Sequence, residues 1–164
     1  MTSLELVCAT ADVLQCWMAD PAALADELDL HIPDGWPEFP ETIPYTLAVL
    51  AEPGSDSQWW MYFFIDQASG QLIGSGGYKG APVDGRVEIG YEIAPEFRGR
   101  GLATQAAGLL VEKAFASGLA EVVQAQTLPE HNPSTAILQR LGFTRISDGF
   151  EADAEQTWVW ERCQ

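Results

Sequence analysis

The stretch Arg98-Gly99-Arg100-Gly101-Leu102-Ala103-Thr104 joins a predicted strand, Val87 to Ile93, to a predicted helix. Apolar residues recur at helical spacing after it, at Leu102, Ala106, Leu109, Leu110 and Ala114. Backbone N–H groups at a helix N-terminus have no intrahelical acceptor and lie at the positive end of the helix dipole. Because two glycines leave this backbone open and two arginines add positive charge, the stretch predicts a cradle for a pyrophosphate.

The same stretch has other interpretations, and the sequence excludes two of them. It lacks the Lys-Ser/Thr ending of a P-loop, and Thr104 stands where a dinucleotide-binding fingerprint has its third glycine. Kinase and dehydrogenase chemistry are therefore excluded. A glycine-rich turn that merely connects a strand to a helix remains open at this point.

The pattern Arg-x-x-Gly-x-Ala at Arg98, Gly101 and Ala103 resembles the acetyl-CoA pyrophosphate motif of the GCN5-related N-acetyltransferases, the GNAT family. A second motif follows at the expected place, because the run from Leu128 to Phe143 is similar to the RimJ/RimL-like branch of that family. Members of this branch acetylate ribosomal-protein N-termini and, in many relatives, other amines. The resemblance covers about residues 72–143.

The order of the other elements agrees with the resemblance. Strands or helices are predicted over the ranges Ala11–Ala19, Pro21–Leu28, Thr46–Ala51, Trp59–Ile65, Gln71–Tyr78, Val122–Thr127, Asn132–Gly142, Phe143–Ser147 and Gln156–Glu161. With the strand and helix around residue 100, the order is ααα-βββ-α-β-α-ββ. It predicts an α/β (mixed α+β) fold in which helices cover both faces of a mixed, mostly antiparallel sheet. An acidic loop is expected between the last two strands.

Between the predicted helices lies His31 to Pro44, a segment with four prolines and two aromatic side chains, Trp36 and Phe39. So many breakers exclude a regular element. Such a segment can fold over an acceptor pocket, or its aromatic residues can anchor a long connection to the core.

Length and composition limit the class of protein. The 164 residues, with a mass of 17.9 kDa, correspond to one domain over 1–164. No apolar run is long enough to cross a bilayer and no signal peptide opens the chain, so a cytoplasmic location and no membrane partner are expected. Three cysteines without CxxC spacing and two isolated histidines predict neither a disulfide framework nor a metal site.

The charge is unevenly distributed. The net charge is −16, which argues against nucleic acid as a partner. Residues 1–78 contain twelve acidic residues and no Lys or Arg, and all eight basic residues lie from Lys79 onward. In the family that the chain resembles, the first half forms one wall of the acceptor site, so the asymmetry suits a cationic amine. Solubility alone is the other explanation.

The resemblance implies where coenzyme A would lie. The sheet is expected to splay between the strand at Val87–Ile93 and the strand at Val122–Thr127, with pantetheine in the gap. Backbone groups near Ile93 and Ala94 would pair with the pantetheine amides. N–H groups of Arg98, Gly99, Arg100, Gly101, Leu102, Ala103 and Thr104 would hold the pyrophosphate.

Amine acetylation requires a free amine lone pair and support for the departing thiolate. Glu88 matches the glutamate that acts as a water-mediated base in the histone-acetyltransferase branch. Strand alternation places Glu88 and Glu92 on one face, where two carboxylates can raise one another's pKa. Glu88 is favoured narrowly as the base and Glu92 is its substitute; pairing with Arg98 or Arg100, or exposure to water, is the structural alternative.

The acid is less clear. Many family members have a tyrosine four residues before the helix-ending glycine, and Leu138 occupies that position here. In the RimL-like branch a serine eight residues before the glycine is proposed to support the thiolate, and Ser134 has that spacing. Asn132 can contact pantetheine, but helix capping explains both residues equally well. Tyr91 and Tyr78 are the other candidate acids.

The sequence thus predicts an acetyl-CoA-dependent N-acetyltransferase that acts by direct transfer in a ternary complex, without a metal. Its acceptor is an amine, which can be a peptide N-terminus, a Lys side chain, an aminoglycoside or a polyamine. The alternative from another class is an acyl-CoA-binding sensor without catalysis. A homodimer is possible, since six tryptophans offer apolar area, although packing of Trp158 and Trp160 in the core is the simpler account.

Overall fold

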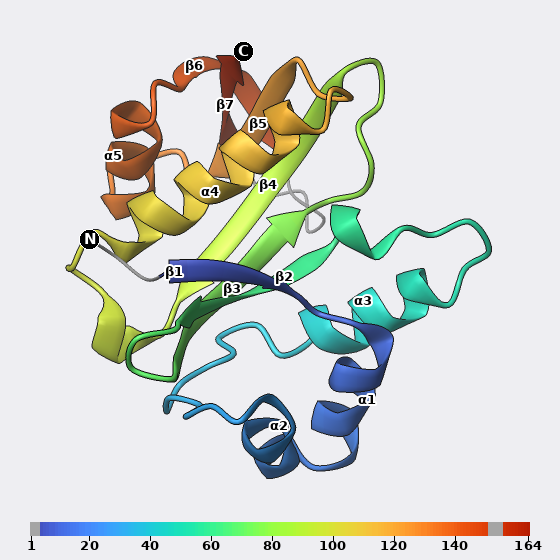
Figure 1. The fold of residues 1–164 in the computed structure, drawn as a ribbon. Coiled ribbons are helices and arrows are strands. Elements are labelled where there is room, and N and C mark those ends of the chain that lie inside the picture. The colour runs from blue at the N-terminus through green and yellow to red at the C-terminus, as the bar shows by residue number, and fades with distance from the viewer. Residues whose placement is uncertain (1–3, 151–155) are drawn as a thin grey trace.

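A computed structural model describes residues 4–150 and 156–164 of the chain. In these residues a seven-stranded sheet is flanked by five α-helices (Figure 1). The elements are β1 (Leu4–Cys8), α1 (Ala11–Ala19), α2 (Pro21–Leu28), α3 (Thr42–Leu50), β2 (Met61–Asp66), β3 (Gln71–Tyr78), β4 (Arg86–Ile93), α4 (Leu102–Ala116), β5 (Val122–Thr127), α5 (Pro133–Arg140), β6 (Thr144–Phe150) and β7 (Gln156–Cys163). Short 3₁₀ turns lie at Ser57–Trp59 and Pro95–Phe97.

The sheet has the strand order β1-β2-β3-β4-β5-β7-β6. Among the described strands only β4 and β5 pair in parallel; the other five pairs are antiparallel. The crossover between the parallel pair contains α4, as a parallel connection requires. The predicted mixed, mostly antiparallel sheet is confirmed.

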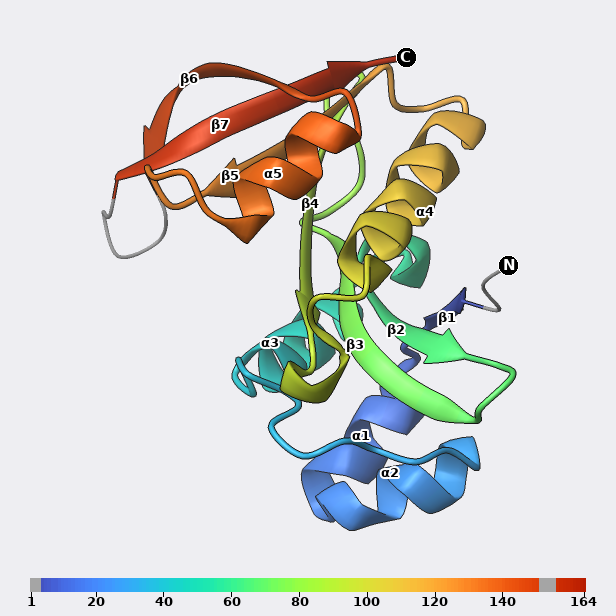
Figure 2. The same cartoon turned by 90° about the vertical axis from the view of Figure 1, so that its left-hand side faces the viewer.

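The pairing of β4 with β5 stops before the end of both strands. Arg86 to Ile89 pair with Val122 to Ala125, and no pairing continues beyond Ile89. On their outer sides β3 pairs with β4 up to Ile93 and β7 pairs with β5 up to Thr127. The two strands therefore lie side by side at one end and separate toward the other (Figure 2). The expected splay is present, and it leaves backbone groups of β4 without a strand partner.

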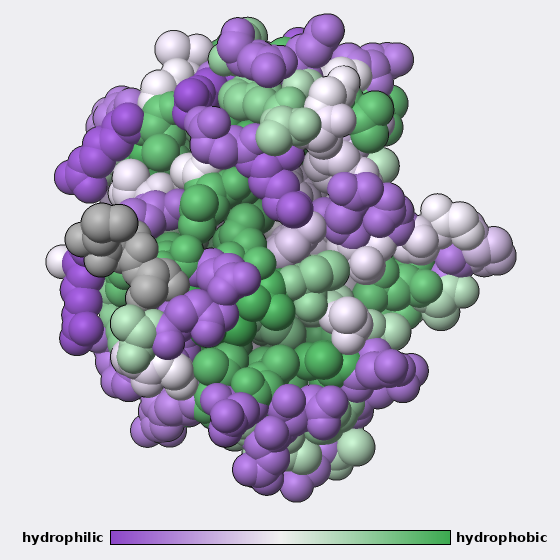
Figure 3. All heavy atoms as spheres, in the orientation of Figure 1, coloured by the Kyte–Doolittle hydropathy of each residue, from purple (hydrophilic) through white to green (hydrophobic). Residues whose placement is uncertain are grey.

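Helices cover both faces of the sheet, as predicted. On one face the Tyr78 hydroxyl donates to the Leu110 carbonyl of α4, at 2.6 Å. On the other face the Trp36 indole N–H donates to the Ser75 hydroxyl, at 2.9 Å. We call these the α4 face and the Trp36 face. Hydrophilic side chains lie mainly around the rim of the molecule and hydrophobic ones in the middle of the view on the α4 side (Figure 3).

Cross-strand register assigns each residue of β4 to a face. Ile89 lies opposite Tyr78, so it points to the α4 face, and Glu92 lies opposite Ser75, so it points to the Trp36 face. No register shift interrupts the pairing of β4 over Arg86–Ile93. Strand alternation therefore places Glu88 with Glu92 on the Trp36 face, and Tyr91 on the α4 face.

The glycines of β3 have a packing reason. A Cβ at Gly74 would lie 2.2 Å from the Glu92 carbonyl oxygen, and one at Gly76 would lie 2.5 Å from the Gly90 carbonyl oxygen. Close approach of the two backbones therefore requires glycine at both positions. An irregularity in the register with β2 lies beside Gly74, between Phe64 and Ile65 of the partner strand.

Two elements differ from the prediction in the first half of the chain. The strand β1 was not expected; its five residues pair with β2 at the edge of the sheet, and that long-range pairing stabilises a segment too short to be recognised by its pattern. The helix α3 begins at Thr42 rather than Thr46, so the end of the proline-rich segment is helical. Pro44 is tolerated because N–H groups of a first turn need no intrahelical acceptor.

Smaller differences concern strand ends. The predicted strand at Trp59–Ile65 is a 3₁₀ turn followed by β2, whose residues are buried on both faces as expected. The last two strands are longer than predicted, and the acidic loop expected between them falls largely on residues 151–155, outside the described residues. In the described part of the chain no helix is long and apolar enough to span a membrane.

Candidate functional site

The turn before α4 has the backbone conformation that its glycines predict. Gly99 and Gly101 adopt left-handed conformations, with φ of 76° and 75°. A Cβ added at either position would meet nothing within 4 Å, so the glycines border open space rather than packed protein. Gly101 is the N-cap residue, and no side chain caps this helix end. The end of α4 is therefore accessible to a ligand.

The N–H groups at this helix end are unused. Over residues 4–150 and 156–164, no backbone or side-chain acceptor bonds the N–H groups of residues 99–104; the first bond of the helix is from Gln105 to the Gly101 carbonyl, at 3.2 Å. Six consecutive free donors at the positive end of a 15-residue helix form an anion site.

One buried acceptor lies next to these donors. The side-chain oxygen Oε1 of Gln105, in the first turn of α4, is buried and has no hydrogen-bond partner. Gly108 is one turn further along the same helix face, and the position of its missing Cβ lies 3.5 Å from Leu141, just after α5. Gln105 thus lies on the helix face that carries Gly108. An unpaired buried acceptor is costly, so a ligand that donates an N–H there would be stabilised.

The end of β4 offers further backbone groups. The Ala94 N–H donates to the Ile73 carbonyl at 2.9 Å, and the Ala94 carbonyl accepts from the Phe97 N–H at 2.9 Å. Both backbone groups of Ala94 are therefore occupied within the protein. By strand alternation, the groups that face the gap belong to Tyr91 and Ile93. The Ile93 carbonyl already accepts a bond from Arg98 Nε, at 2.9 Å. This bond does not involve the Ile93 N–H.

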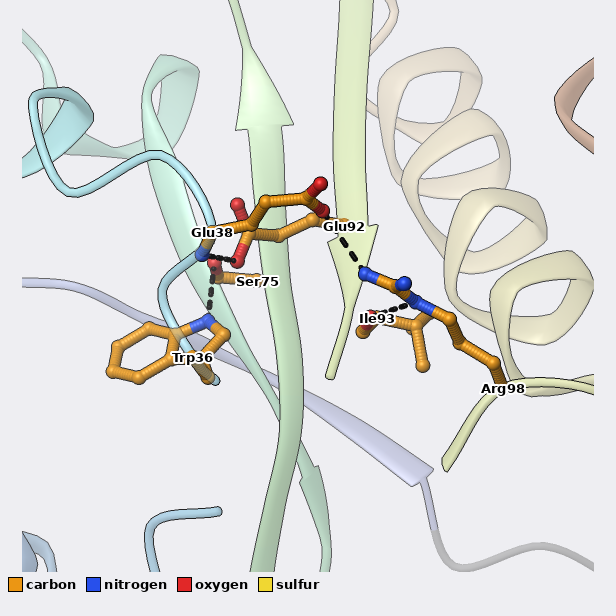
Figure 4. Close-up of polar contacts among 6 residues, drawn as sticks. All are labelled: Trp36, Glu38, Ser75, Glu92, Ile93 and Arg98. Atoms are coloured by element: carbon orange, nitrogen blue, oxygen red, sulfur yellow. Dashed lines mark hydrogen bonds and ion pairs between the residues drawn. The ribbon is translucent and has the colours of Figure 1, made fainter. Parts of the chain in front are cut away.

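The two arginines of the turn behave differently. Arg98 directs its guanidinium to the end of β4 and to Glu38, with 2.9 Å between Nη2 and Oε2 (Figure 4). Arg100 lies with its guanidinium 5.5 Å from the centre of the Phe97 ring, which is a cation–π distance. Of these two arginines, Arg98 pairs with a carboxylate and Arg100 has no carboxylate partner among the described residues.

Glu92 lies half-buried beneath the segment that follows Trp36. Its Oε1 accepts the main-chain N–H of Glu38 at 2.8 Å (Figure 4). Burial raises the pKa of the Glu92 carboxyl, and the Glu38 carboxylate adds to this, while the N–H groups of Glu38 and Phe39 and the charge of Arg98 oppose it. The like charge acting on Glu92 is therefore that of Glu38, not of Glu88 as we expected.

Glu88 is held by a cation. Its Oε1 lies 2.7 Å from the Lys79 ammonium and accepts a weaker bond from Gln126 Nε2 at 3.3 Å. Gln126 belongs to β5 and in turn accepts from Thr157 of β7, at 2.5 Å. Glu88 is thus part of a polar network across three strands. The structural alternative of an ion pair applies to Glu88, with Lys79 as the partner instead of an arginine.

Asn132 and Ser134 at the start of α5 have different hydrogen-bond partners, although the sequence offered no reason to distinguish them. Asn132 caps the helix: its Oδ1 accepts from the Thr135 N–H and its own N–H donates to Thr135 Oγ1, each at 3.0 Å. Ser134 is half-buried and, within the described residues, makes no hydrogen bond. Capping therefore explains Asn132 and does not explain Ser134. Leu138, at the position of the usual tyrosine, is 1% exposed and belongs to the core.

The two tyrosine candidates also differ. The Tyr78 hydroxyl is committed to the Leu110 carbonyl, and burial raises its pKa. Burial raises the pKa of Tyr91 to about 12, so this half-buried hydroxyl stays protonated near neutral pH. Tyr91 is on the face of β4 that carries α4, opposite to the face of the two glutamates. It can donate a proton from the side away from them.

Several residues of the site were missed by the sequence analysis. Glu38 lies in the segment that we singled out for its aromatic residues, but nothing in the sequence pairs it with Arg98, sixty residues away. Lys79 could have been found, because it directly follows a predicted strand that pairs with the strand of Glu88. Gln105 could have been placed on the helix face of Gly108 by its spacing. Among the described residues no group of three or more His, Cys, Asp or Glu could hold a metal ion.

Comparison with known proteins agrees with this geometry. A family model described as the acetyltransferase (GNAT) domain matches residues 8–144. The chain belongs to the GNAT acetyltransferase family. A curated relative, an uncharacterized N-acetyltransferase p20 of Bacillus licheniformis, is 29% identical over 96 residues, which is 58% of this chain and 53% of the relative. The aligned part thus spans about half the length of that GNAT relative.

Solved structures show the same GNAT fold. The acetyltransferase from Salmonella typhimurium that modifies the N-terminal serine of ribosomal protein L7/L12 matches with a TM-score of 0.68 and 20% identity, over 100% of this chain and 96% of the other. The microcin C7 self-immunity acetyltransferase, solved with acetyl-CoA and AMP, matches with a TM-score of 0.68 and 14% identity, over 99% and 93%. The expected likeness to RimL-type enzymes is confirmed for the fold.

Proposed function

We propose that this chain is an acetyl-CoA-dependent N-acetyltransferase that transfers an acetyl group to a primary amine by direct attack in a ternary complex, with residues 1–164 as one acetyltransferase domain. The observation that carries the proposal is the set of six free N–H groups over residues 99–104, next to the gap between β4 and β5. Membership of the GNAT family and the acetyl-CoA in the microcin C7 enzyme support the choice of ligand.

The residues present fit coenzyme A along its length. The N–H groups of Gly99, Arg100, Gly101, Leu102, Ala103 and Thr104 would hold the pyrophosphate, with added charge from Arg100. The backbone groups of Tyr91 and the N–H of Ile93 would pair with pantetheine amides. Ala94 and the Ile93 carbonyl would contribute less, because they are already hydrogen-bonded within the protein. Gln105 Oε1 and the unused amide N–H₂ of Asn132 are further partners in the gap. When bound, acetyl-CoA supplies a thioester carbonyl that an amine can attack.

We assign the base to Glu92, with Glu88 as the second candidate. An ammonium group must lose a proton before it attacks, and a carboxylate with a raised pKa is better matched to that task near neutral pH. Glu92 has the raised pKa and no Lys partner, whereas Lys79 holds Glu88. Both side chains project from the same face of β4, so exchanging their roles requires no change in the fold.

The proton donor for the leaving thiolate belongs on the other face. Tyr91 keeps its proton near neutral pH and projects to the α4 face. Ser134 is free of the capping box and stands in the first turn of α5, beyond the gap. We propose these two hydroxyls as donors, with Ser134 first because of its spacing in the motif. With Tyr91 as the acid, base and acid would act from opposite faces of β4; with Ser134, the acid would come from α5.

The acceptor that we propose is cationic. Glu38 and Glu92 lie together on the Trp36 face, and Glu38 belongs to residues 1–78, which contain no Lys or Arg. A protonated amine would be attracted to this side by the summed negative charge. The RimL-like match from Salmonella typhimurium acts on a protein N-terminus, and that class of acceptor is the first to try.

A non-catalytic acyl-CoA sensor is the second candidate, and Leu138 favours it because the position of the common tyrosine acid is part of the core. A sensor would bind coenzyme A with no amine-dependent release of thiol. Replacing Glu92 or Ser134 would then change nothing measurable.

The location and the oligomeric state stay predictions. A cytoplasmic location was expected from the sequence. None of the six tryptophans that prompted the idea of a homodimer is among the exposed large hydrophobic residues, and Trp160 is 3% exposed and donates to Thr127 Oγ1 at 3.0 Å. They offer little surface to a second copy, and sedimentation at several concentrations would test whether another surface does.

The experiment that tests the proposed function is calorimetric titration with acetyl-CoA of the wild type, Gly101→Glu and Gly118→Glu. Gly118 is a matched control, because it has φ of 76° and open space around it, at the other end of α4. Both variants suffer the same left-handed strain, but only Gly101→Glu brings a negative charge to the free N–H groups. We expect a loss of affinity of about a hundredfold or more in Gly101→Glu alone. An amine screen with thiol release as readout follows.

No binding by a folded wild type would overturn the proposal. Equal loss in the two variants would show that strain, not the cradle, controls the affinity. Binding without turnover on any amine would favour the sensor.

A further inference from the structure

The side chain of Arg98 points away from the helix that its motif opens. Its Nε donates to the Ile93 carbonyl and its Nη2 to Glu38 Oε2, both at 2.9 Å. Figure 4 shows the guanidinium beside the end of β4, with contacts to Glu38 and to the Ile93 carbonyl. One of its donors is therefore used at the end of β4 and one at Glu38, and neither is directed to the helix end that carries the free N–H groups of residues 99–104.

Glu38 connects this arginine to Glu92. Its carboxylate pairs with Arg98, while its main-chain N–H donates to Glu92 Oε1 at 2.8 Å. Because the two bonds arise from the same residue, the position of the Glu38 side chain constrains the position of its N–H. Arg98 thus influences Glu92 through one intervening residue, in addition to its direct charge.

The segment that carries Glu38 is attached at a second point. Two residues earlier, the buried Trp36 donates its indole N–H to Ser75 at 2.9 Å and packs edge-to-face on Phe63, with 6.0 Å between ring centres. Ser75 is the cross-strand neighbour of Glu92. Trp36 therefore anchors one end of residues 36–38 in the core, and Arg98 holds the exposed end.

The ion pair itself is too exposed to determine the fold. The Arg98 and Glu38 side chains are 52% and 50% exposed, and pairs of this kind contribute little to global stability. Its removal should leave the fold intact and release only the segment that it holds, which belongs to the class of surface connections that open locally.

We propose that Arg98 is a positioning residue for the acceptor side of the site: through Glu38 it holds residues 36–38 on β4, so that the Glu38 N–H keeps the Glu92 carboxylate in place. The inference rests on the proposed function. It gives the two arginines of the motif different roles. Arg100 and the backbone N–H groups would bind the phosphates, whereas Arg98 would connect the turn before α4 to the acceptor side of the site.

The test compares Arg98→Met with Arg98→Lys, Arg100→Met and Arg140→Met. Arg140 is a control for loss of charge alone, in the last turn of α5. One readout is hydrogen exchange of the Glu38 amide, followed by NMR, and the other is calorimetric titration with coenzyme A itself. In Arg98→Met the Glu38 amide should exchange about tenfold faster or more, with coenzyme A affinity within about twofold of the wild type.

The other variants should behave differently. Arg100→Met should leave the Glu38 amide unchanged and weaken coenzyme A about tenfold, because it removes a charge from the cradle. Arg98→Lys should restore part of the protection, since an ammonium can pair with Glu38 but cannot also make the Nε bond to Ile93. Arg140→Met should match the wild type in both readouts.

Wild-type exchange of the Glu38 amide in Arg98→Met, or a loss of affinity equal to that of Arg100→Met, would overturn the inference. If Arg98→Met does not fold, Glu38→Gln provides the same test, because it breaks the ion pair and leaves the bond to Ile93. A wild type that binds no coenzyme A would overturn the proposed function alone, since the exchange of the Glu38 amide is measured without ligand.

Discussion

Lys79 bonds Glu88 twice, through its ammonium at 2.7 Å from Oε1 and through its main-chain N–H at 2.9 Å from the Glu88 carbonyl oxygen. The residue that the family motif suggests as the base is therefore held from both its side chain and its backbone. Glu92, four residues later on the same face, is bonded by an N–H group and buried instead. The two glutamates are alike in the sequence and unlike in their surroundings.

We expect Glu92→Gln to lower turnover by about 10² or more and Glu88→Gln by less than about tenfold, because the first removes a proton acceptor and the second a member of a surface ion pair. The measurement is thiol release at saturating acetyl-CoA with an amine found by the screen. Lys79→Met serves as the control for loss of the pair, with a cost below about 1 kcal/mol in urea unfolding. Equal losses in the two glutamine variants would return the role of base to Glu88.

The raised pKa of Glu92 predicts a pH dependence of stability. The folded state binds this proton more tightly than the unfolded state, so the contribution of Glu92 to stability falls as pH rises from the unfolded pKa of about 4.3 through the folded pKa. Urea unfolding between pH 4 and 8 gives the difference in the free energy of unfolding between the wild type and Glu92→Gln. We expect the difference to grow in favour of the variant across that window and then to level off.

A difference that is independent of pH would contradict the raised pKa.

The same group predicts that turnover falls as pH drops through the folded pKa of Glu92, because the protonated carboxyl cannot accept the amine proton. Glu92→Gln should lack this acidic limb.

Trp36→Phe should destabilise the protein by about 1–2 kcal/mol, because it leaves the buried Ser75 hydroxyl without its donor. Ser75→Ala should cost a similar amount, since it leaves the indole N–H unpaired. The double variant loses both partners of one bond and should cost less than the two single changes together. Urea unfolding of the four proteins measures the coupling, and additive costs would show that the two side chains do not depend on each other.

Asn132→Ala should cost about 1 kcal/mol of stability through loss of the capping box at α5. Ser134→Ala, in contrast, should change stability by less than about 0.5 kcal/mol, since Ser134 makes no bond in the described residues, and should lower turnover by about tenfold or more. Thermal unfolding and thiol release together separate capping from chemistry. Unchanged turnover in Ser134→Ala would transfer the role of acid to Tyr91, for which Tyr91→Phe is the direct test.

Local patterns were enough to predict most of the elements. The predicted bounds of β3, β5, α1 and α2 coincide with those in the structure. The caps, glycines and periodicity that define these elements can be recognised from neighbouring residues in the sequence. The cradle was predicted for the same reason: a helix N-terminus and its two glycines are close in sequence, and the chemistry of free N–H groups follows from that geometry.

Long-range pairing decided what local patterns could not. The edge strand β1 is stabilised by β2, more than fifty residues later, and has no distinctive pattern of its own. The start of α3 could not be predicted because Pro44 can either end the irregular segment before a helix or lie in the first turn of that helix. Both choices depend on contacts with the rest of the fold rather than on propensity.

The sequence alone determined the family motif, the glycine turn before α4, the order of the elements after β1 and the acidic first half, since each depends on residue type and short spacing. Tertiary structure decided the roles within the site. It paired Lys79 with Glu88 and Arg98 with Glu38, buried Glu92, and separated Ser134 from the cap formed by Asn132. The physical reason is that burial, ion pairing and pKa depend on which side chains the fold brings together across the sheet.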